Sequence, residues 1–382
     1  MKSLGLLAVI AGGVFGLFIW QLGSLTPGMS PAEKAAAFTS QSPQIIADNS
    51  LYGPFKLLQY VLNQTGLSQP FSLRLASVIF ALMIIASFYT IVKAWFGRIV
   101  GLLSTLLLVG TPLLLVSARQ TTPEVMYLAP VILMAAYYWL LRTQKHYKIA
   151  WVLLIATAAL CLYVPGLVWW VLAGVITARR RLFSAFKKMP RSLTIGAVVL
   201  AIVLVAPLIL AISENPSILR VLALLPETLP EPLTAIKSIG WMFLALVWQA
   251  PYHYPLIIDR LPTFNMILIA LSIFGMYAMW TNARNKTYAL ASTIGFSIIA
   301  SGLNQNPALL IFSLPAVTVF AAAGLRYLHV EWNSIFPYNP LPRFLAIVLM
   351  LALVTAHMFL GIRYGLVAWP RSLDTQHLYV LQ

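Results

Sequence analysis

The chain has 382 residues, of which 60% are hydrophobic and only 9% are charged, and its mean hydropathy is +0.87. This composition excludes a water-soluble globular domain. The net charge of +16 comes from basic residues scattered in short clusters between apolar segments, so we expect no nucleic-acid partner. The sequence predicts a single transmembrane domain over residues 1–382, embedded in the lipid bilayer of the cell membrane.

Apolar segments of about 20 residues recur along the whole chain, and each could cross a hydrocarbon layer about 30 Å thick as a helix. They predict an all-α, polytopic transmembrane bundle with roughly nine full spans. These spans cover residues 4–25, 73–95, 99–116, 125–141, 193–213, 263–281, 287–303, 307–325 and 344–364. The segment 149–177 is longer and is interrupted by Pro165 and Gly166, which predicts a hairpin of two short helices there.

The basic clusters fall in alternate connections, which the positive-inside rule assigns to the cytoplasm together with the N-terminus. The C-terminus is then expected outside. The outer side receives eight of the nine acidic residues, namely Glu33, Asp48, Glu124, Glu214, Glu227, Glu231, Asp259 and Asp374. This segregation predicts that an active site or a cation-binding site lies at the outer face.

Two long segments, 26–72 and 214–262, follow spans on the predicted outer side. In the first, Phe55, Leu58, Val61 and Leu62 fall near one face of a helix, which predicts an interfacial helix. In the second, the apolar run 239–250 is too short to span a bilayer, so we expect a re-entrant or surface-lying helix.

Two carboxylates are the candidate catalytic groups. Glu33 follows the first span and Glu124 precedes the fourth, so both are predicted at the outer mouth of the bundle. A partly shielded carboxylate there can act as a general base or hold a divalent cation, which is the one candidate cofactor. Alternatively, each is simply an acidic charge at the positive end of a helix dipole.

Cationic side chains on the outer side are the candidate substrate-binding groups. Arg74 and Arg119 lie at the outer ends of spans, and Lys56 and Arg260 are weaker versions of the same pattern. An arginine fork suits a lipid-linked phosphate, but the same residues could extend to ordinary phospholipid headgroups. His253 lies among aromatic residues, as either an interface anchor or a site residue.

The order of several motifs resembles the GT-C glycosyltransferases of the protein O-mannosyltransferase and aminoarabinose transferase type. These motifs are Gly66 and Ser68, then Arg74 and Leu75, then Phe96, Gly97 and Arg98, then Ser117, Arg119 and Glu124, and finally a Leu-Pro helix around Pro315. The resemblance is best over the first 140 residues. It implies sugar transfer from a polyprenyl-phosphate donor to a protein or glycolipid acceptor at the outer face.

In that family a carboxylate of the first outer loop is the base. The resemblance therefore implies that Glu33 is the base or a metal ligand and that Glu124 assists it. It also implies that the arginines neutralise the departing phosphate. The family's Asp-Glu pair reads Ala32-Glu33 here, and Glu124 stands where Asp is common. A non-catalytic GT-C-like subunit of a glycan-assembly complex is therefore an alternative. A lipid-linked sugar flippase or transporter is a second one, although the spans show neither inverted repeats nor paired charges.

Overall fold

The computed structural model describes residues 2–143, 146–187, 189–228, 230–250 and 254–380, and within these ranges every regular element is a helix. Five segments are long and apolar enough to cross a membrane: Phe71–Phe96, Pro123–Arg142, Arg191–Glu214, Pro307–Ile335 and Pro340–Arg371. Shorter apolar helices accompany them. The protein is thus an all-α, multi-pass membrane bundle, while the number of nine spans stays a prediction.

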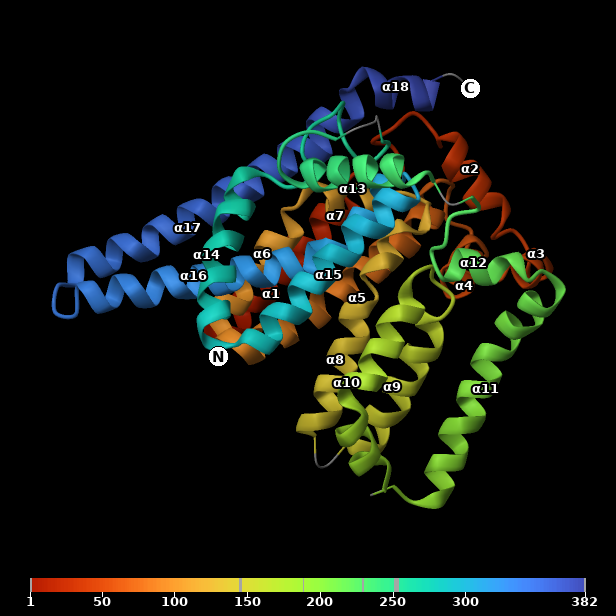
Figure 1. Cartoon of the computed structure of the whole chain (residues 1–382). Helices are drawn as coiled ribbons and strands as arrows, with labels where there is room; N and C mark the ends of the chain where they lie inside the picture. The colour runs from red at the N-terminus through yellow and green to blue at the C-terminus, as the bar shows by residue number, and fades with distance from the viewer. Residues whose placement is uncertain (1, 144–145, 188, 229, 251–253, 381–382) are drawn as a thin grey trace.

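Eight of the predicted spans correspond to helices. These are α1 (Lys2–Ile19), α5 (Phe71–Phe96), α8 (Pro130–Arg142), α11 (Arg191–Glu214), α14 (Met266–Asn282), α15 (Arg284–Leu303), α16 (Leu314–Ile335) and α17 (Pro340–Ile362). The 3₁₀ segments Pro123–Leu128 and Pro307–Ser313 lead into α8 and α16. The N-terminus and α18 (Leu373–Val380) lie at opposite ends of the bundle (Figure 1).

The predicted span 99–116 is wrong as a single helix, because it is broken into α6 (Arg98–Val109) and α7 (Pro112–Ser117). Pro112 has no N–H to continue the ladder, and it disfavours the helical conformation at the preceding residue. At the break, α17 passes so closely that a Cβ on Gly361 would collide with the carbonyl oxygen of Gly110. A buried histidine, His357, fixes this crossing through hydrogen bonds to Leu107 O (2.8 Å) and to the Asn265 side chain.

The predicted interruption at Pro165 and Gly166 is confirmed, since α9 (Tyr147–Cys161) ends before it and α10 (Leu167–Lys187) begins after it. Gly166 has a positive φ of 82°, which a glycine adopts without strain. The second helix, however, is 21 residues long rather than short. It continues through the arginines at 179–181 because Arg, Leu, Ala and Lys are good helix formers and the helix end is exposed to solvent.

The centre of the bundle is α16, packed against α14, α5 and α6. All residues from Leu314 to Leu325 except the intermediate Pro315 are buried. The crossing of α14 and α16 depends on two glycines, since a Cβ on Gly275 would collide with Phe320 O and one on Gly324 with Leu271 O. Small residues at this crossing therefore allow the two backbones to touch.

Substitution of Gly275 by alanine is expected to lower the free energy of unfolding by about 1–3 kcal/mol, because the methyl group forces the two helix backbones apart. The measurement is thermal or denaturant unfolding in detergent. Gly295→Ala on α15 is the matched control, since no atom lies within 4 Å of its added Cβ. Equal unfolding midpoints for the two variants would contradict the close crossing.

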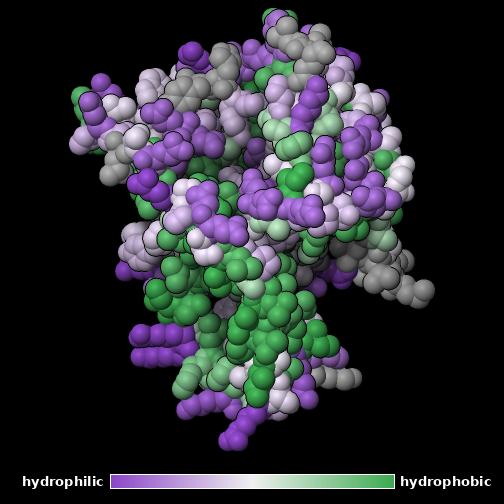
Figure 2. Space-filling view, turned by 90° about the vertical axis from the view of Figure 1, so that its right-hand side faces the viewer, coloured by the Kyte–Doolittle hydropathy of each residue, from purple (hydrophilic) through white to green (hydrophobic). Residues whose placement is uncertain are grey.

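Short helices cover the upper end of the bundle in Figure 1. They are α2 (Pro31–Phe38), α3 (Pro43–Asp48), α4 (Gly53–Asn63), α12 (Ser217–Leu222), α13 (Pro232–Val247) and α18. The non-spanning helix predicted at 239–250 is α13, which begins earlier and exposes Ile236, Trp241 and Phe243. Figure 2 shows a hydrophobic band in the lower half of the molecule and mostly hydrophilic surface above it.

The predicted interfacial helix is α4, but its proposed apolar face is only partly correct. Phe55 is 1% exposed and packs against Phe80, whereas Val61 is 53% exposed. The buried residues of α4 also include Lys56 and Gln59. The helix therefore turns polar side chains inward, which a hydrophobic pattern alone cannot reveal, because that pattern assumes a uniformly apolar interior.

Candidate active site

Glu33 lies in the first turn of α2, where it completes a capping box with Ser30. The Ser30 hydroxyl accepts a hydrogen bond from the Glu33 N–H, and the Glu33 carboxylate accepts one from the Ser30 N–H, both at 3.2 Å. This arrangement satisfies two N–H groups that the helix itself leaves unpaired. The alternative view of Glu33 as a helix N-terminal charge is thus confirmed, although it is only part of the residue's environment.

The Glu33 carboxylate also forms a buried, two-point ion pair with Arg74 of α5. Arg74 Nε donates to Oε1 and Nη2 donates to Oε2, each at 2.9 Å, and the side chains are 1% and 3% exposed. The Thr121 N–H donates to Oε1 at 2.9 Å. Both carboxylate oxygens of Glu33 therefore already accept hydrogen bonds from the protein.

The guanidinium group of Arg74 is likewise hydrogen-bonded to protein partners. Besides Glu33, its guanidinium donates to Leu22 O, to the Thr26 hydroxyl and to Gly28 O, at 2.8–3.0 Å. These contacts attach the chain that leaves α1 to the start of α5. Arg74 therefore connects the segment that follows α1 to the bundle, and no N–H of its Nε or Nη2 is left for a substrate phosphate.

Arg119 lies close to Arg74 and is 6% exposed. Its guanidinium donates to Leu17 O at 2.8 Å and to Trp20 O at 2.6 Å, near the end of α1, while its Nε has no partner. Burial, and then the charge of Arg74, lower the pKa of Arg119 to about 10, so it stays cationic at neutral pH. The two arginines thus share one region.

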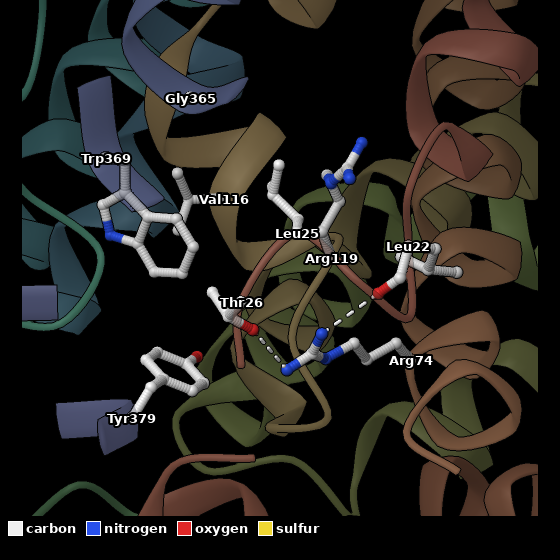
Figure 3. A pocket seen from close by; sticks show the side chains of 9 residues that line it. All are labelled: Leu22, Leu25, Thr26, Arg74, Val116, Arg119, Gly365, Trp369 and Tyr379. Atoms are coloured by element: carbon white, nitrogen blue, oxygen red, sulfur yellow. Dashed lines mark hydrogen bonds between the residues drawn. The ribbon is translucent and has the colours of Figure 1, made fainter. Parts of the chain in front are cut away.

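The space beside these arginines is small, about 10 Å³, which is room for one water molecule. In Figure 3 the two arginines lie on one side of it, and Trp369 and Tyr379 on the other. Tyr379, from α18, forms hydrogen bonds with the side chains of Ser30 and Glu33. Burial, and then the charge of Glu33, raise the pKa of the Tyr379 hydroxyl. The C-terminal segment therefore closes this cluster against a larger ligand.

The segment 26–72 and the loop 118–122 are joined by buried polar contacts. Gln59 of α4 donates to Thr121 O at 2.7 Å, and the Ser77 hydroxyl donates to Gln120 O at 2.5 Å. With the Glu33–Thr121 contact, these bonds fix the backbone that leads directly to Glu124. Glu33 and Glu124 therefore belong to one region, as their mutual electrostatic influence also indicates.

A cavity of about 270 Å³ lies on the other side of this junction. It is lined by residues of α2, α4 and the loops beside them, including Thr39, Asn49, Tyr52, Lys56, Gln59 and Pro123. Lys56 is 6% exposed, and its ammonium donates to Asn49 O at 2.7 Å. Burial lowers the pKa of Lys56 to about 8. An ammonium group has three N–H donors, so this contact leaves two for a ligand.

Three tyrosines, Tyr52, Tyr127 and Tyr254, lie close enough to Glu124 to be influenced by its charge, and Tyr52 also lines this cavity. The hydroxyls of Tyr52 and Tyr127 lie 2.6 Å apart, and the pKa of Tyr52 is raised by burial, by Tyr127 and by Glu124. Burial and then Glu124 also raise the pKa of Tyr254. Glu124 Oε2 is buried and has no hydrogen-bond partner. A buried unpaired carboxylate oxygen is costly and is characteristic of functional sites.

The sequence analysis did not single out Tyr52, Gln59, Tyr127 or Tyr379. The one signal for Tyr52 is its place before Gly53-Pro54, where it adopts a left-handed backbone with φ of 57°. Such a conformation costs free energy in a residue other than glycine and is often found at functional sites. The other three are recognisable only from their tertiary contacts.

One of the predicted site residues, Arg260, is not part of this cluster. Arg260 has an exposed side chain on the connection between α13 and α14, where its carbonyl accepts from the Ala250 N–H. His253 lies outside the described residues. Within the described ranges no three His, Cys, Asp or Glu side chains converge as a metal ion would require. We therefore derive no step through a cation.

Comparisons with known proteins agree with this architecture. Residues 56–210 match the family described as dolichyl-phosphate-mannose-protein mannosyltransferase. The fold is similar to that of ArnT from Cupriavidus metallidurans in the apo state, with a TM-score of 0.65 and 14% identity over 100% of this chain and 78% of that one. For ArnT bound to undecaprenyl phosphate the TM-score is 0.62 and the identity 13%, over 99% of this chain and 78% of that one.

No curated protein sequence matches the chain. The family match nevertheless contains Lys56, Arg74, Arg119 and Glu124, and the fold similarity extends along the whole chain. The family match over residues 56–210 and the fold similarity therefore point the same way: the chain has the fold of ArnT, and within that segment it is similar to the dolichyl-phosphate-mannose-protein mannosyltransferase family.

Proposed function

We propose that the protein is a membrane glycosyltransferase that transfers a sugar from a polyprenyl-phosphate donor to an acceptor at the outer face. The observation that carries this proposal is the cavity lined by Lys56, a buried cation with unused donors, and by Pro123, which precedes Glu124 in the chain; the Oε2 atom of Glu124 is buried without a hydrogen-bond partner. Both residues lie in the segment that matches the mannosyltransferase family. The structure of ArnT bound to undecaprenyl phosphate supports a lipid phosphate as the ligand class.

In this proposal Lys56 binds the donor phosphate. Its charge compensates the negative charge that grows on the phosphate as the bond to the sugar breaks, and burial strengthens this interaction relative to water. Arg74 and Arg119 retain the roles that their contacts give them, which are to hold the end of α1 and the loop 118–122 in place. Arg119 also contributes positive charge nearby.

Glu124 acts as the general base. An acceptor hydroxyl attacks the anomeric carbon, the bond from that carbon to the phosphate oxygen breaks with its electron pair going to the phosphate, and Glu124 takes the proton of the hydroxyl. Glu33, which the family resemblance nominates as the base, supports this step instead through the Thr121 N–H contact that fixes the loop before Glu124. Both oxygens of Glu33 already accept hydrogen bonds from the protein, whereas Glu124 Oε2 has no partner.

The direct test is reconstitution of the purified protein in liposomes with labelled polyprenyl-phosphate sugars and a mixture of candidate acceptors. Transfer of label, or saturable binding of the donor, is the expected result. If the donor is neither bound nor consumed, while the protein remains folded by circular dichroism, the proposal is refuted.

Donor affinity is expected to depend on pH because the pKa of Lys56 is about 8. Below pH 8 the ammonium is charged and binds phosphate fully; above it, affinity falls by up to about tenfold per pH unit. The measurement is the donor Kd between about pH 6.5 and 9.5. Lys56→Arg is the control, since a guanidinium stays protonated over this range and its affinity is expected to vary far less.

A donor-binding protein without transferase activity is the second candidate, and it is favoured by the occupied state of the Glu33 carboxylate. Such a protein would bind the lipid phosphate through Lys56 and support a partner glycosyltransferase. In cells, loss of the glycan phenotype in Lys56→Met but not in Glu124→Gln would favour this candidate. Loss in both variants would favour the enzyme.

A further inference from the structure

The segment 125–213 contains no aspartate or glutamate, although it forms four helices. Its basic residues are Arg142, Lys145, Lys148, Arg179, Arg180, Arg181, Lys187, Lys188 and Arg191. All of them fall at the end of α8, the start of α9, the end of α10 and the start of α11, or in the connections between these helices. This is the largest set of basic residues in the chain without an acidic residue among them.

These four helix ends lie together at the lower end of the molecule in Figure 1. They share a hydrophobic core separate from the main one, formed by Leu140 of α8, Trp151 and Leu154 of α9 and Ala197 of α11, with Leu182 of α10 packed against it. Trp151 also contacts the ring of Phe186 from α10. The packing therefore brings the basic clusters of two separate connections to one surface.

The basic side chains on this surface are exposed, and aromatic side chains are exposed beside them. Phe183 and Phe186 of α10 are 60% and 43% exposed, and Lys187 Nζ lies 4.7 Å from the Phe183 ring centroid. Arg142 stacks on the Tyr138 ring at 4.9 Å. Figure 2 shows the hydrophobic band of the lower half ending in a hydrophilic rim at this same end. Basic and aromatic residues at the edge of an apolar band are typical of contact with lipid headgroups.

We propose that this surface, defined by Arg142, Lys148, Arg179, Arg180, Arg181, Lys187 and Arg191, binds anionic phospholipid headgroups in preference to zwitterionic ones. The surface is complementary in charge to an anionic headgroup, because it carries seven cations on four adjacent helix ends and the segment that forms it contains no acid. These cations lie where the apolar band meets water. In phosphatidylcholine the choline cation compensates the negative phosphate, whereas the phosphatidylglycerol headgroup has no cation and keeps its net negative charge. The inference is independent of the glycosyltransferase proposal, because the surface lies at the end opposite α2 and the cavity.

The test measures which lipids the intact protein and its variants retain from detergent micelles that contain equal amounts of phosphatidylglycerol and phosphatidylcholine. Native mass spectrometry counts the retained lipids. The test variant is Arg179→Gln/Arg180→Gln/Arg181→Gln. The matched control is Lys34→Gln/Arg220→Gln/Lys237→Gln, which removes the same charge from exposed positions on helices α2, α12 and α13 at the other end. We expect the intact protein and the control to prefer phosphatidylglycerol, and the test variant to lose this preference by on the order of 100-fold at low salt.

Salt provides a second measurement that needs no variant. The preference of the intact protein for phosphatidylglycerol is expected to weaken markedly when the ionic strength is raised to about 1 M, because charges at a surface are then screened within about 3 Å. No preference in the intact protein, a preference that salt leaves unchanged, or an equal loss in the two triple variants would each overturn the proposal. The last result would show that net charge, rather than this surface, selects the lipid.

Discussion

Substitution of Glu124 by glutamine is expected to lower the rate of sugar transfer by about 10²–10⁴-fold while donor affinity stays nearly constant. Glutamine preserves the size of the side chain but cannot accept the proton of the acceptor hydroxyl. The donor phosphate, in contrast, is bound by Lys56, which this change does not touch. The measurement is single-turnover transfer in liposomes together with donor Kd, because together they separate the chemical step from binding.

Glu214→Gln is the matched control for this experiment, since Glu214 is an exposed acid at the end of α11 and should leave the rate unchanged. Glu33→Gln provides the decisive comparison. If Glu33→Gln abolishes transfer in a protein of normal stability while Glu124→Gln remains active, the base is Glu33, as the family resemblance implies. The assignment of Glu124 would then be wrong.

Replacement of Arg74 by methionine is expected to destabilise the protein by about 3–5 kcal/mol, because it leaves the Glu33 carboxylate buried without its counter-charge. The change also removes the hydrogen bonds that Leu22 O and Gly28 O accept from the guanidinium. Unfolding in detergent, followed by circular dichroism against temperature or denaturant, measures the effect. The exposed Arg220 offers a control, since Arg220→Met should change the free energy of unfolding by less than about 0.5 kcal/mol.

The double variant Glu33→Gln/Arg74→Met distinguishes the structural role of the pair from a substrate-binding role. If the pair is structural, the neutral combination recovers part of the stability lost in Arg74→Met, because no unpaired charge remains buried. If Arg74 instead binds the donor phosphate, Arg74→Met would retain normal stability and lose donor affinity. That second result would restore the sequence-based interpretation of Arg74.

The position of the helices could be predicted because hydropathy is a local property. A run of apolar residues determines by itself that a segment is buried in lipid or in protein, and Pro165-Gly166 determines by itself that the helix stops. The span that differs from the prediction, 99–116, is consistent with this reasoning. Residues 99–116 look continuous in hydropathy, but Pro112 and the close approach of Gly361 to Gly110 break the helix, and only the first of these two causes is local.

The sequence nominated residues and roles for the candidate site, but it could not show which of their polar groups are already occupied by protein partners. Sequence placed Glu33, Arg74, Arg119 and Glu124 at one end of the bundle, and the structure brings Glu33, Arg74 and Arg119 into one cluster. It could not rank the cations. Lys56, which sequence placed below the arginines, has unused donors beside the larger cavity, whereas Arg74 is held by its carboxylate and carbonyl partners.

By itself, the sequence determined that this chain is an all-helical membrane protein and where its longest helices lie. Only the tertiary structure decided which of its charges are neutralised and which remain free to bind a ligand. The physical reason is distance along the chain. Arg74 meets Glu33 across 41 residues, Gln59 meets Thr121 across 62 and Arg119 meets Leu17 across 102, so the availability of each charge depends on partners that no local pattern contains.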